Sequence, residues 1–266
     1  MLAKLEIETT SPPSDELVDA LEGYLASLAW SGQVHRNYLV SYAPLAACAE
    51  LPRYNALQSR FLSKRGRVAV KRLTDLAGSP PAWELIGLPP AGRSPSWRSA
   101  SALYLFTHAL THCSPVRAVN FEAGVPLYLL PVSEALREEL GRWAEIYREH
   151  DSIWLSSGTL EIPAYRELAE PGSELSAHGR RLCRSLEKAT GKPTFYYSMR
   201  YFARGEGEEE RRCPGCSGTW RVDRLPWKAT KFARFDFICR RCRLVSHVGV
   251  STGDPARYAR IGEPRK

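Results

Sequence analysis

Apolar and polar residues follow regular patterns near the start of the chain, and these patterns predict a strand, a helix and a second strand. Residues 2–10 alternate apolar with charged side chains, as a strand with one buried face does. Within residues 15–30 apolar residues recur every three or four positions, after Ser14 and before Gly32, as in a capped helix. Residues 35–45 predict the next strand.

The middle of the chain has less regular patterns. A basic stretch at residues 63–73 contains a predicted strand, and the five prolines of residues 78–96 predict a loop-rich connection. Residues 99–112 are predominantly apolar and predict a buried helix. Residues 125–131 predict a short strand closed by proline.

The patterns become regular again towards the C-terminus. Helices are predicted at residues 134–150, with one apolar stripe, and at residues 174–190, where Gly191 follows the end. The aromatic residues 194–202 predict a strand, and residues 203–210 an exposed acidic linker. The alternation of strands and helices is too irregular for a doubly wound sheet and favours an α+β fold.

Two matched cysteine pairs are the most specific motif in the chain. Each has the form C-x₂-C, and 22 residues separate them: Cys213, Cys216, Cys239 and Cys242. A two-residue turn lets both sulfurs of a pair point at one ion, and four thiolates complete the tetrahedral shell that structural zinc prefers. The spacing therefore predicts one structural zinc ion per chain, held in a β zinc ribbon.

The predicted elements divide the chain into three segments. At 266 residues and 44% hydrophobic, the chain is long enough for one sizeable core and a small extra module. We expect an α+β N-terminal domain at residues 1–203, a small C-terminal β zinc ribbon at 204–252, and a basic C-terminal tail at 253–266.

The positive charge is concentrated in the segment that carries the cysteines. From residue 200 onward there are 16 Lys and Arg against 8 Asp and Glu, whereas the preceding residues balance. The net charge of +8 therefore lies in this segment, and four thiolates around a divalent ion would lower it to +6. A field of this kind attracts polyanions, although a soluble protein can carry it without such a partner.

Arginines surround the cysteines, and two interpretations of them stay open. These residues are Arg211, Arg212, Arg240, Arg241 and Arg243. They could contact phosphates of nucleic acid, or they could compensate the charge of the thiolates. The neighbouring aromatic residues could stack on bases, but we expect them mainly to fill the small ribbon core: Trp220, Trp227, Phe232 and Phe235.

Other candidate sites are weaker. His108 and His112 lie one helical turn apart, but Ala109 stands where a metalloprotease helix has glutamate, so we expect a pair in the core or at a helix end. We expect His247 to be a strand residue and not a metal ligand. Basic residues also line one face of the helix at 174–190, where a solvated face is expected, although they could extend a nucleic-acid surface: Arg180, Arg184 and Lys188.

The sequence also indicates the cellular compartment in which the protein is expected. The first residues do not have the pattern of a signal peptide, and no apolar stretch is long enough to span a bilayer. Seven cysteines, an odd number, favour a reducing environment over a disulfide framework. We therefore expect a cytoplasmic protein without contact to a membrane.

The C-terminal half resembles a bacterial family of Zn-ribbon-containing proteins of unknown function, for which nucleic-acid binding has been suggested. The resemblance rests on residues 179–202, on "RRCPGC" and on "FDFICRRCRLVSH", with a fainter likeness at 114–117 and 125–131. It implies that the four paired cysteines are the zinc ligands. Two residues depart from the family pattern, which has tyrosine in place of Phe195 and asparagine in place of His247.

These observations favour a non-enzymatic binding protein. The first hypothesis is binding of DNA or RNA through the basic face of the ribbon. The alternative is a protein-interaction module, such as an immunity-type protein that neutralises a bacterial toxin. An enzyme with its site in residues 1–200 is the least favoured class, because no catalytic motif is present there.

Overall fold

The structure is a computed structural model that describes residues 1–9, 12–87, 96–251 and 258–264. The chain forms two compact units, and the second contains most of its C-terminal two thirds. The first unit comprises residues 1–94, 112–114 and 126–138, and the second residues 95–111, 115–125 and 139–266. This division does not follow the boundary expected at residue 203.

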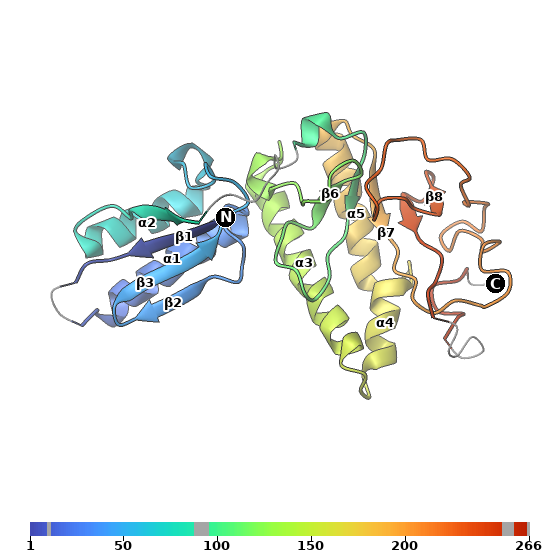
Figure 1. Ribbon diagram of the computed structural model, residues 1–266, viewed down its shortest axis with the longest axis horizontal. Helices are drawn as coiled ribbons and strands as arrows, with labels where there is room; N and C mark the ends of the chain where they lie inside the picture. The colour runs from blue at the N-terminus through green and yellow to red at the C-terminus, as the bar shows by residue number, and fades with distance from the viewer. Residues whose placement is uncertain (10–11, 88–95, 252–257, 265–266) are drawn as a thin grey trace. The chain divides into compact units, whose positions relative to one another are not determined.

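The first unit is a four-stranded antiparallel sheet with two helices (Figure 1). The strands lie in the order β2-β3-β1-β4, which together with the chain order gives the β-α-β-β-α-β arrangement called ferredoxin-like. Its elements are β1 (Leu2–Glu6), α1 (Asp15–Ser31), β2 (Leu39–Tyr42), β3 (Leu45–Glu50), η1 (Ser59–Phe61), α2 (Lys64–Ala77), β4 (Trp83–Ile86) and η3 (Leu127–Leu129).

Helix α1 confirms the helix predicted at residues 15–30, but the strand predicted within residues 63–73 is wrong, because this stretch forms α2. Ser63 caps α2 by accepting the N–H of Gly66, and Gly78 ends it in the left-handed conformation. Leu73 is buried in the core of the unit. The alternation of valines with basic residues resembles the pattern of a strand, but the capping residues at both ends favour a helix.

The second unit contains a five-stranded mixed sheet in the order β6-β5-β7-β9-β8 (Figure 1). Strands β5, β7 and β9 are parallel to one another, while β6 and β8 are antiparallel edge strands. The elements are η2 (Trp97–Ser99), β5 (Leu103–Leu105), β6 (Val116–Ala118), α3 (Glu134–Leu155), α4 (Glu161–Ala169), α5 (Glu174–Thr190), β7 (Thr194–Tyr197), β8 (Phe237–Cys239) and β9 (Leu244–Ser246); the first residues of α3 belong to the first unit.

Two predictions for the middle of the chain are wrong. The helix expected at residues 99–112 is replaced by β5, whose three residues are all buried between β6 and β7. A strand that is buried on both faces has no polar alternation, and its sequence is therefore easily taken for a buried helix. The strand expected at residues 125–131 forms the 3₁₀ helix η3, since Pro126 and Pro131 lack the N–H groups that a strand ladder needs.

Helix α5 packs closely against β7 in the second unit. A Cβ atom added at Gly179 would lie 2.4 Å from the ring of Tyr196, so only glycine allows this approach. The indole of Trp143 on α3 donates to the carbonyl of Leu175 at 3.2 Å. The helices predicted at residues 134–150 and 174–190 and the strand predicted at 194–202 are confirmed, although β7 ends at Tyr197.

The cysteine-bearing segment is part of the sheet of the second unit, because β9 pairs directly with β7. Within the segment expected to form a separate ribbon, the strands β8 and β9 form, and Arg221 makes a single bridge to Phe237 of β8. The described part of the expected C-terminal tail, residues 258–264, is also folded, since Ala259 and Ile261 are buried. In the described part of the chain no helix combines the length and the hydropathy that a membrane span requires.

Candidate metal centre

The two cysteine pairs meet at one point. The sulfurs of Cys213, Cys216, Cys239 and Cys242 all lie within 4.8 Å of one another, and those of Cys216 and Cys239 are 3.7 Å apart. A tetrahedral zinc site, with Zn–S bonds of about 2.3 Å, places its sulfurs about 3.8 Å apart. The cluster can therefore hold one metal ion, and four thiolates leave no position open for a substrate.

The two pairs share one unusual backbone conformation. The residue after each second cysteine is left-handed without being glycine, with φ of 56° at Ser217 and 53° at Arg243. The amide of Ser217 donates to the carbonyl of Cys213 at 2.8 Å, and the amide of Cys242 donates to the sulfur of Cys239 at 3.4 Å. Such strained backbone persists where the surrounding structure requires it, and here it aims both pairs at one point.

Gly215 in the first pair is required by the sulfur beside it. A Cβ atom at this position would lie 2.8 Å from the sulfur of Cys242 and 3.2 Å from its Cβ. A larger residue would push the second pair away from the first. The glycine therefore belongs to the metal site, although it offers no ligand atom.

Three of the four thiols have shifted pKa values, and the shifts differ because their surroundings differ. The backbone N–H of Gly218 lowers the pKa of Cys216 to about 7, so this thiol loses its proton more readily than those of Cys213 and Cys242. Burial raises the pKa of Cys242 to about 12 and also raises the pKa of Cys213. Burial makes it costly to ionise these thiols. A bound cation would offset this cost, because it stabilises the thiolates and displaces their protons.

The structure separates the five arginines predicted to contact nucleic acid. Arg211 is only 2% exposed, which excludes it from a phosphate-binding surface. Arg243 is half-buried and binds the carboxylate of Glu187 on α5 through two nitrogens, at 2.8 and 3.0 Å. The remaining three are exposed: Arg212, Arg240 and Arg241.

Arg243 links the second cysteine pair to α5. Its hydrogen bond is the main cause that lowers the pKa of Glu187, whose carboxylate also accepts the N–H of Thr194 at the start of β7. Through Glu187, the guanidinium of Arg243 connects α5, the start of β7 and the turn that follows the second cysteine pair. This role is structural, and it differs from both interpretations that the sequence left open.

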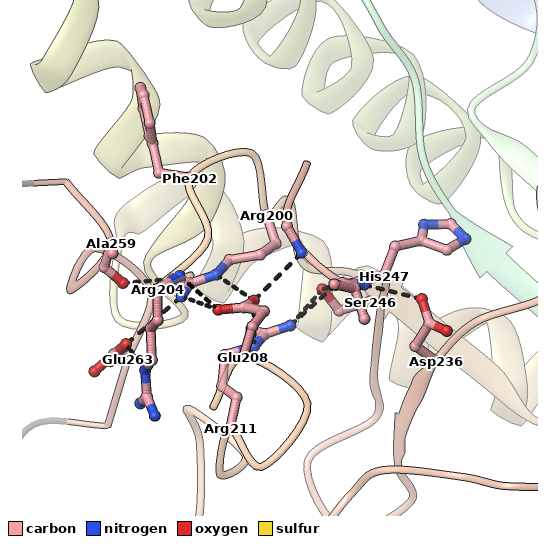
Figure 2. A network of polar contacts seen from close by, with 12 residues as sticks. Arg200, Phe202, Arg204, Glu208, Arg211, Asp236, Ser246, His247, Ala259 and Glu263 are labelled. Atoms are coloured by element: carbon pink, nitrogen blue, oxygen red, sulfur yellow. Dashed lines mark hydrogen bonds and ion pairs between the residues drawn. The ribbon is translucent and has the colours of Figure 1, made fainter. Parts of the chain in front are cut away.

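The segment just before Cys213, which the sequence predicted to be an exposed acidic linker, takes part in a buried ionic network (Figure 2). Glu208 is 4% exposed and binds Arg200 through both carboxylate oxygens, at 2.9 and 2.8 Å. The same guanidinium donates to the carbonyls of Ala259 and Ile261 at 2.8 Å each. The network therefore holds the C-terminal residues 258–264 against the unit.

Arg211 belongs to this network (Figure 2). Its guanidinium donates to the Oγ of Ser246 and to the carbonyl of His247, both at 3.1 Å, and lies 3.4 Å from Glu208. It also lies over the rings of Trp220 and Phe237, 4.8 and 4.5 Å from their centroids. Arg211 thus contributes to the packing of the segment, just before the first ligand.

The aromatic residues of the segment mostly fill the core, as expected. Trp220 and Phe235 are buried, and Trp227 is half-buried against Phe195. Phe232 differs, since 40% of its surface is exposed.

The histidines do not form a metal site with the cysteines. Among the described residues, the four cysteines are the only cluster of three or more potential ligands. His108 lies in the loop after β5, beside Phe106, and not on a helix. One ring nitrogen of His247 lies 3.2 Å from the hydroxyl of Tyr197, and the other lies 2.8 Å from the carbonyl of Phe232. His247 follows β9 and is not a ligand.

Sequence reasoning missed the buried acidic residues of the second unit. Glu208 stands in a run of acidic residues that reads as solvated. Asp151 continues the apolar stripe of α3 that contains Trp143 and Tyr147. An acidic residue in register with an apolar stripe is the pattern that could have revealed it.

Comparison with known proteins places the chain among bacterial proteins of undefined function. Residues 98–199 match a domain of unknown function (DUF2310), and residues 203–251 match a second one (DUF8594). The second match begins and ends one residue before the corresponding boundaries of the cysteine-bearing segment expected from the sequence, residues 204–252.

Two proteins of Haemophilus influenzae, each described as an uncharacterized protein, are similar to this chain over 157 residues. One is 35% identical over 58% of this chain and 72% of its own length. The other is 34% identical over 58% of this chain and 56% of its own length. No solved structure matches the chain.

Proposed function

The chain belongs to the same bacterial family as the Haemophilus influenzae proteins, and we propose that it binds nucleic acid through a basic surface around a structural zinc ion, without catalysing a reaction. The observation that carries the proposal is the position of Arg212, Arg240 and Arg241. All three are exposed and adjoin the cysteine cluster. Among the described residues none of them has an acidic partner within ion-pair distance.

Zinc is the metal that this donor set favours. Four thiolates in a tetrahedron suit zinc or iron, and a closed shell without open positions is typical of structural zinc. The ion would hold the two pairs together and so fix the exposed arginines on both turns. It would supply no reactive water, which supports a binding protein over a metalloenzyme.

Helix α5 extends the same surface. Arg184 and Lys188 are exposed on α5, whose Glu187 contacts the second cysteine turn through Arg243. These two cations and the three exposed arginines form what we call the metal-end surface. Contacts of this kind neutralise phosphates without reading sequence, so the expected binding is strong at low salt and independent of sequence.

The test is a titration of the metal-loaded protein with mixed-sequence DNA and RNA at several salt concentrations. Replacing the three arginines by Ala should weaken binding to all sequences by a similar factor. Each lost phosphate contact lowers the slope of log K against log salt by about 0.9 for duplex DNA and about 0.7 for single strands. The triple variant should therefore lose a slope of about 2–3 on duplex DNA.

A matched control removes three exposed cations from the first unit, Lys64, Arg65 and Arg72 of α2. This variant has the same net charge, so it should bind as the parent does if the metal-end surface is the site. Equal losses in both variants would show an effect of net charge alone. If the metal-loaded parent binds no nucleic acid even at low salt, the proposal fails and the protein-partner alternative takes its place.

A further inference from the structure

A hollow of about 860 Å³ lies in the second unit, at the edge of the sheet opposite to the metal cluster. Its lining includes Phe106, Tyr197 and His247, which stand at or just beyond the carboxyl ends of the parallel strands β5, β7 and β9. The cysteines, in contrast, lie where β8 ends and β9 begins. Crevices at the carboxyl ends of parallel strands are where open α/β sheets bind ligands.

Six of the 18 residues that line this hollow are Phe, Tyr or Trp. Phe106 and Phe232 are stacked with ring centroids 4.8 Å apart, and Tyr197 lies edge-on to Phe106 at 4.7 Å. Trp154 and Tyr201 continue the lining, with their rings 5.0 Å apart. The rings of Phe106, Trp154, Tyr201 and Phe232 are at least partly exposed and offer several π faces to one bound group.

One carboxylate in this aromatic lining has no Lys or Arg partner. Asp151 on α3 is 4% exposed and accepts the N–H of Ala109 at 2.7 Å. Among the described residues no Lys or Arg forms an ion pair with it. Burial raises its pKa, although the amide of Ala109 and the charge of His108 oppose the change. Burial also lowers the pKa of His108, which disfavours its charged form, so the protein alone compensates the negative charge of Asp151 poorly.

A second polar group of the lining lacks a partner altogether. Tyr147 is 1% exposed, and its hydroxyl has no hydrogen-bond partner. A buried hydroxyl without a partner costs stability, which makes it a candidate for a contact with a bound molecule. Tyr147 and Asp151 lie one turn apart on α3, so both groups belong to one part of the hollow.

The guanidinium groups near the hollow are already occupied. Arg200 lines it but donates to Glu208 through Nε and Nη2 and to two carbonyls through Nη1. Arg117 lies over the ring of Phe106 and donates to the carbonyl of Glu122. The carboxylate of Glu122 is exposed at the rim.

The other charges of the lining leave the balance negative. Asp236 is paired with Arg221 at 3.3 Å and accepts the N–H of Val248, while Lys231 is exposed (Figure 2 shows Asp236 beside His247). Aromatic faces together with an uncompensated carboxylate attract cations and repel phosphates. We propose that this hollow binds an organic cation, with an ammonium head held between the aromatic rings and Asp151.

The inference does not depend on the nucleic-acid proposal, because the two sites lie at opposite edges of the sheet and prefer opposite charges. The head group could come from a free amine such as choline or from a methylated lysine of a peptide. Both sources present the same chemistry to the hollow, and the experiment separates them.

The experiment compares choline with its neutral isostere 3,3-dimethylbutan-1-ol on the metal-loaded, full-length protein. NMR titration follows the indole N–H of Trp154 and the amide of Ala109. Choline should shift both resonances and bind at least tenfold more tightly than the isostere. A trimethyllysine peptide that binds more tightly than choline identifies a peptide as the source, and equal or weaker binding identifies a free amine.

Asp151→Asn removes the charge but keeps an acceptor for Ala109, and it should weaken choline binding at least tenfold. Asp223→Asn, an exposed position outside the hollow, is the control of equal charge and should bind as the parent does. The comparison of isosteres needs no variant, so it decides the matter even if Asp151→Asn does not fold. Equal affinity for the two isosteres, or no shift with choline, overturns the proposal.

Discussion

Replacing Glu208 by Gln tests whether the buried ionic network is a structural requirement of the second unit. The change removes one negative charge from a place where Arg200 and Arg211 are both buried. Gln keeps one oxygen, so it can accept one of the two hydrogen bonds from Arg200 but cannot compensate its charge. The perturbation is therefore electrostatic and leaves the shape of the side chain unchanged.

The expected cost is large because the partners cannot reach water. Removing one member of a buried ion pair typically costs about 3–5 kcal/mol. For a unit of this size, each kcal/mol shifts the melting temperature by about 2–4 °C, so the second unit should melt roughly 6–20 °C lower. The nearby Glu209→Gln is the matched control, since that side chain is 70% exposed and should change stability by less than about 0.5 kcal/mol.

The same pair predicts how stability depends on pH. Burial alone would raise the pKa of Glu208, but the hydrogen bonds and charge of Arg200 outweigh it and lower the pKa below the ordinary value of 4.5. A lowered pKa contributes stability above the unfolded value, and this contribution is lost as the pH falls through the folded value. The parent should therefore lose stability more steeply below about pH 4.5 than Glu208→Gln does.

The assay is thermal and urea unfolding of both variants with metal bound, followed by near-ultraviolet circular dichroism. A cost below about 1 kcal/mol for Glu208→Gln, or an equal cost for Glu209→Gln, would show that the network does not hold the unit together.

Three further predictions concern the metal site and the packing of α5. Elemental analysis should find one zinc ion per chain, and chelation should lower the unfolding midpoint of the second unit while the first unit keeps its own transition; nitrogen or oxygen ligation in X-ray absorption would contradict the all-sulfur site. Gly215→Ala should weaken metal affinity about 10–100-fold in a competition with a chromophoric chelator, because its Cβ would lie 2.8 Å from the sulfur of Cys242. Gly179→Ala should destabilise the second unit by about 1–3 kcal/mol in urea unfolding, whereas Gly172→Ala, with no atom within 4 Å of the added Cβ, should not.

Features that depend on short-range spacing could be predicted from the sequence. The helices at residues 15–30, 134–150 and 174–190 were found because one face of each buries apolar residues at helical intervals. The cluster of four cysteines was found for a similar reason. A two-residue turn fixes both sulfurs of a pair, and the sequence then needs only to bring two such turns together.

The predicted type of element was wrong where distant parts of the chain form the environment of a segment. β5 is a strand because β6 and β7 pair with it on either side. In the pairing with β7, Leu103 lies opposite Thr194, which is 91 residues later in the chain. The second cysteine pair belongs to a shared sheet for the same reason, since β9 pairs with β7. Hydrogen bonds between distant strands leave no periodic pattern that a short window could show.

The charges show most clearly what only the tertiary structure decides. Arg211 and Arg212 are neighbours in the sequence, yet the first is buried in an ionic network and the second is exposed. Glu208 and Glu209 differ in the same way. The sequence alone determined how many charges the segment carries and indicated that its four cysteines share one site. Which charges face solvent depends on partners that are distant in the sequence, such as the carbonyl of Ile261, which lies 61 residues from Arg200. A buried charge persists only where folding brings a compensating group to it, and only the tertiary structure decides where that happens.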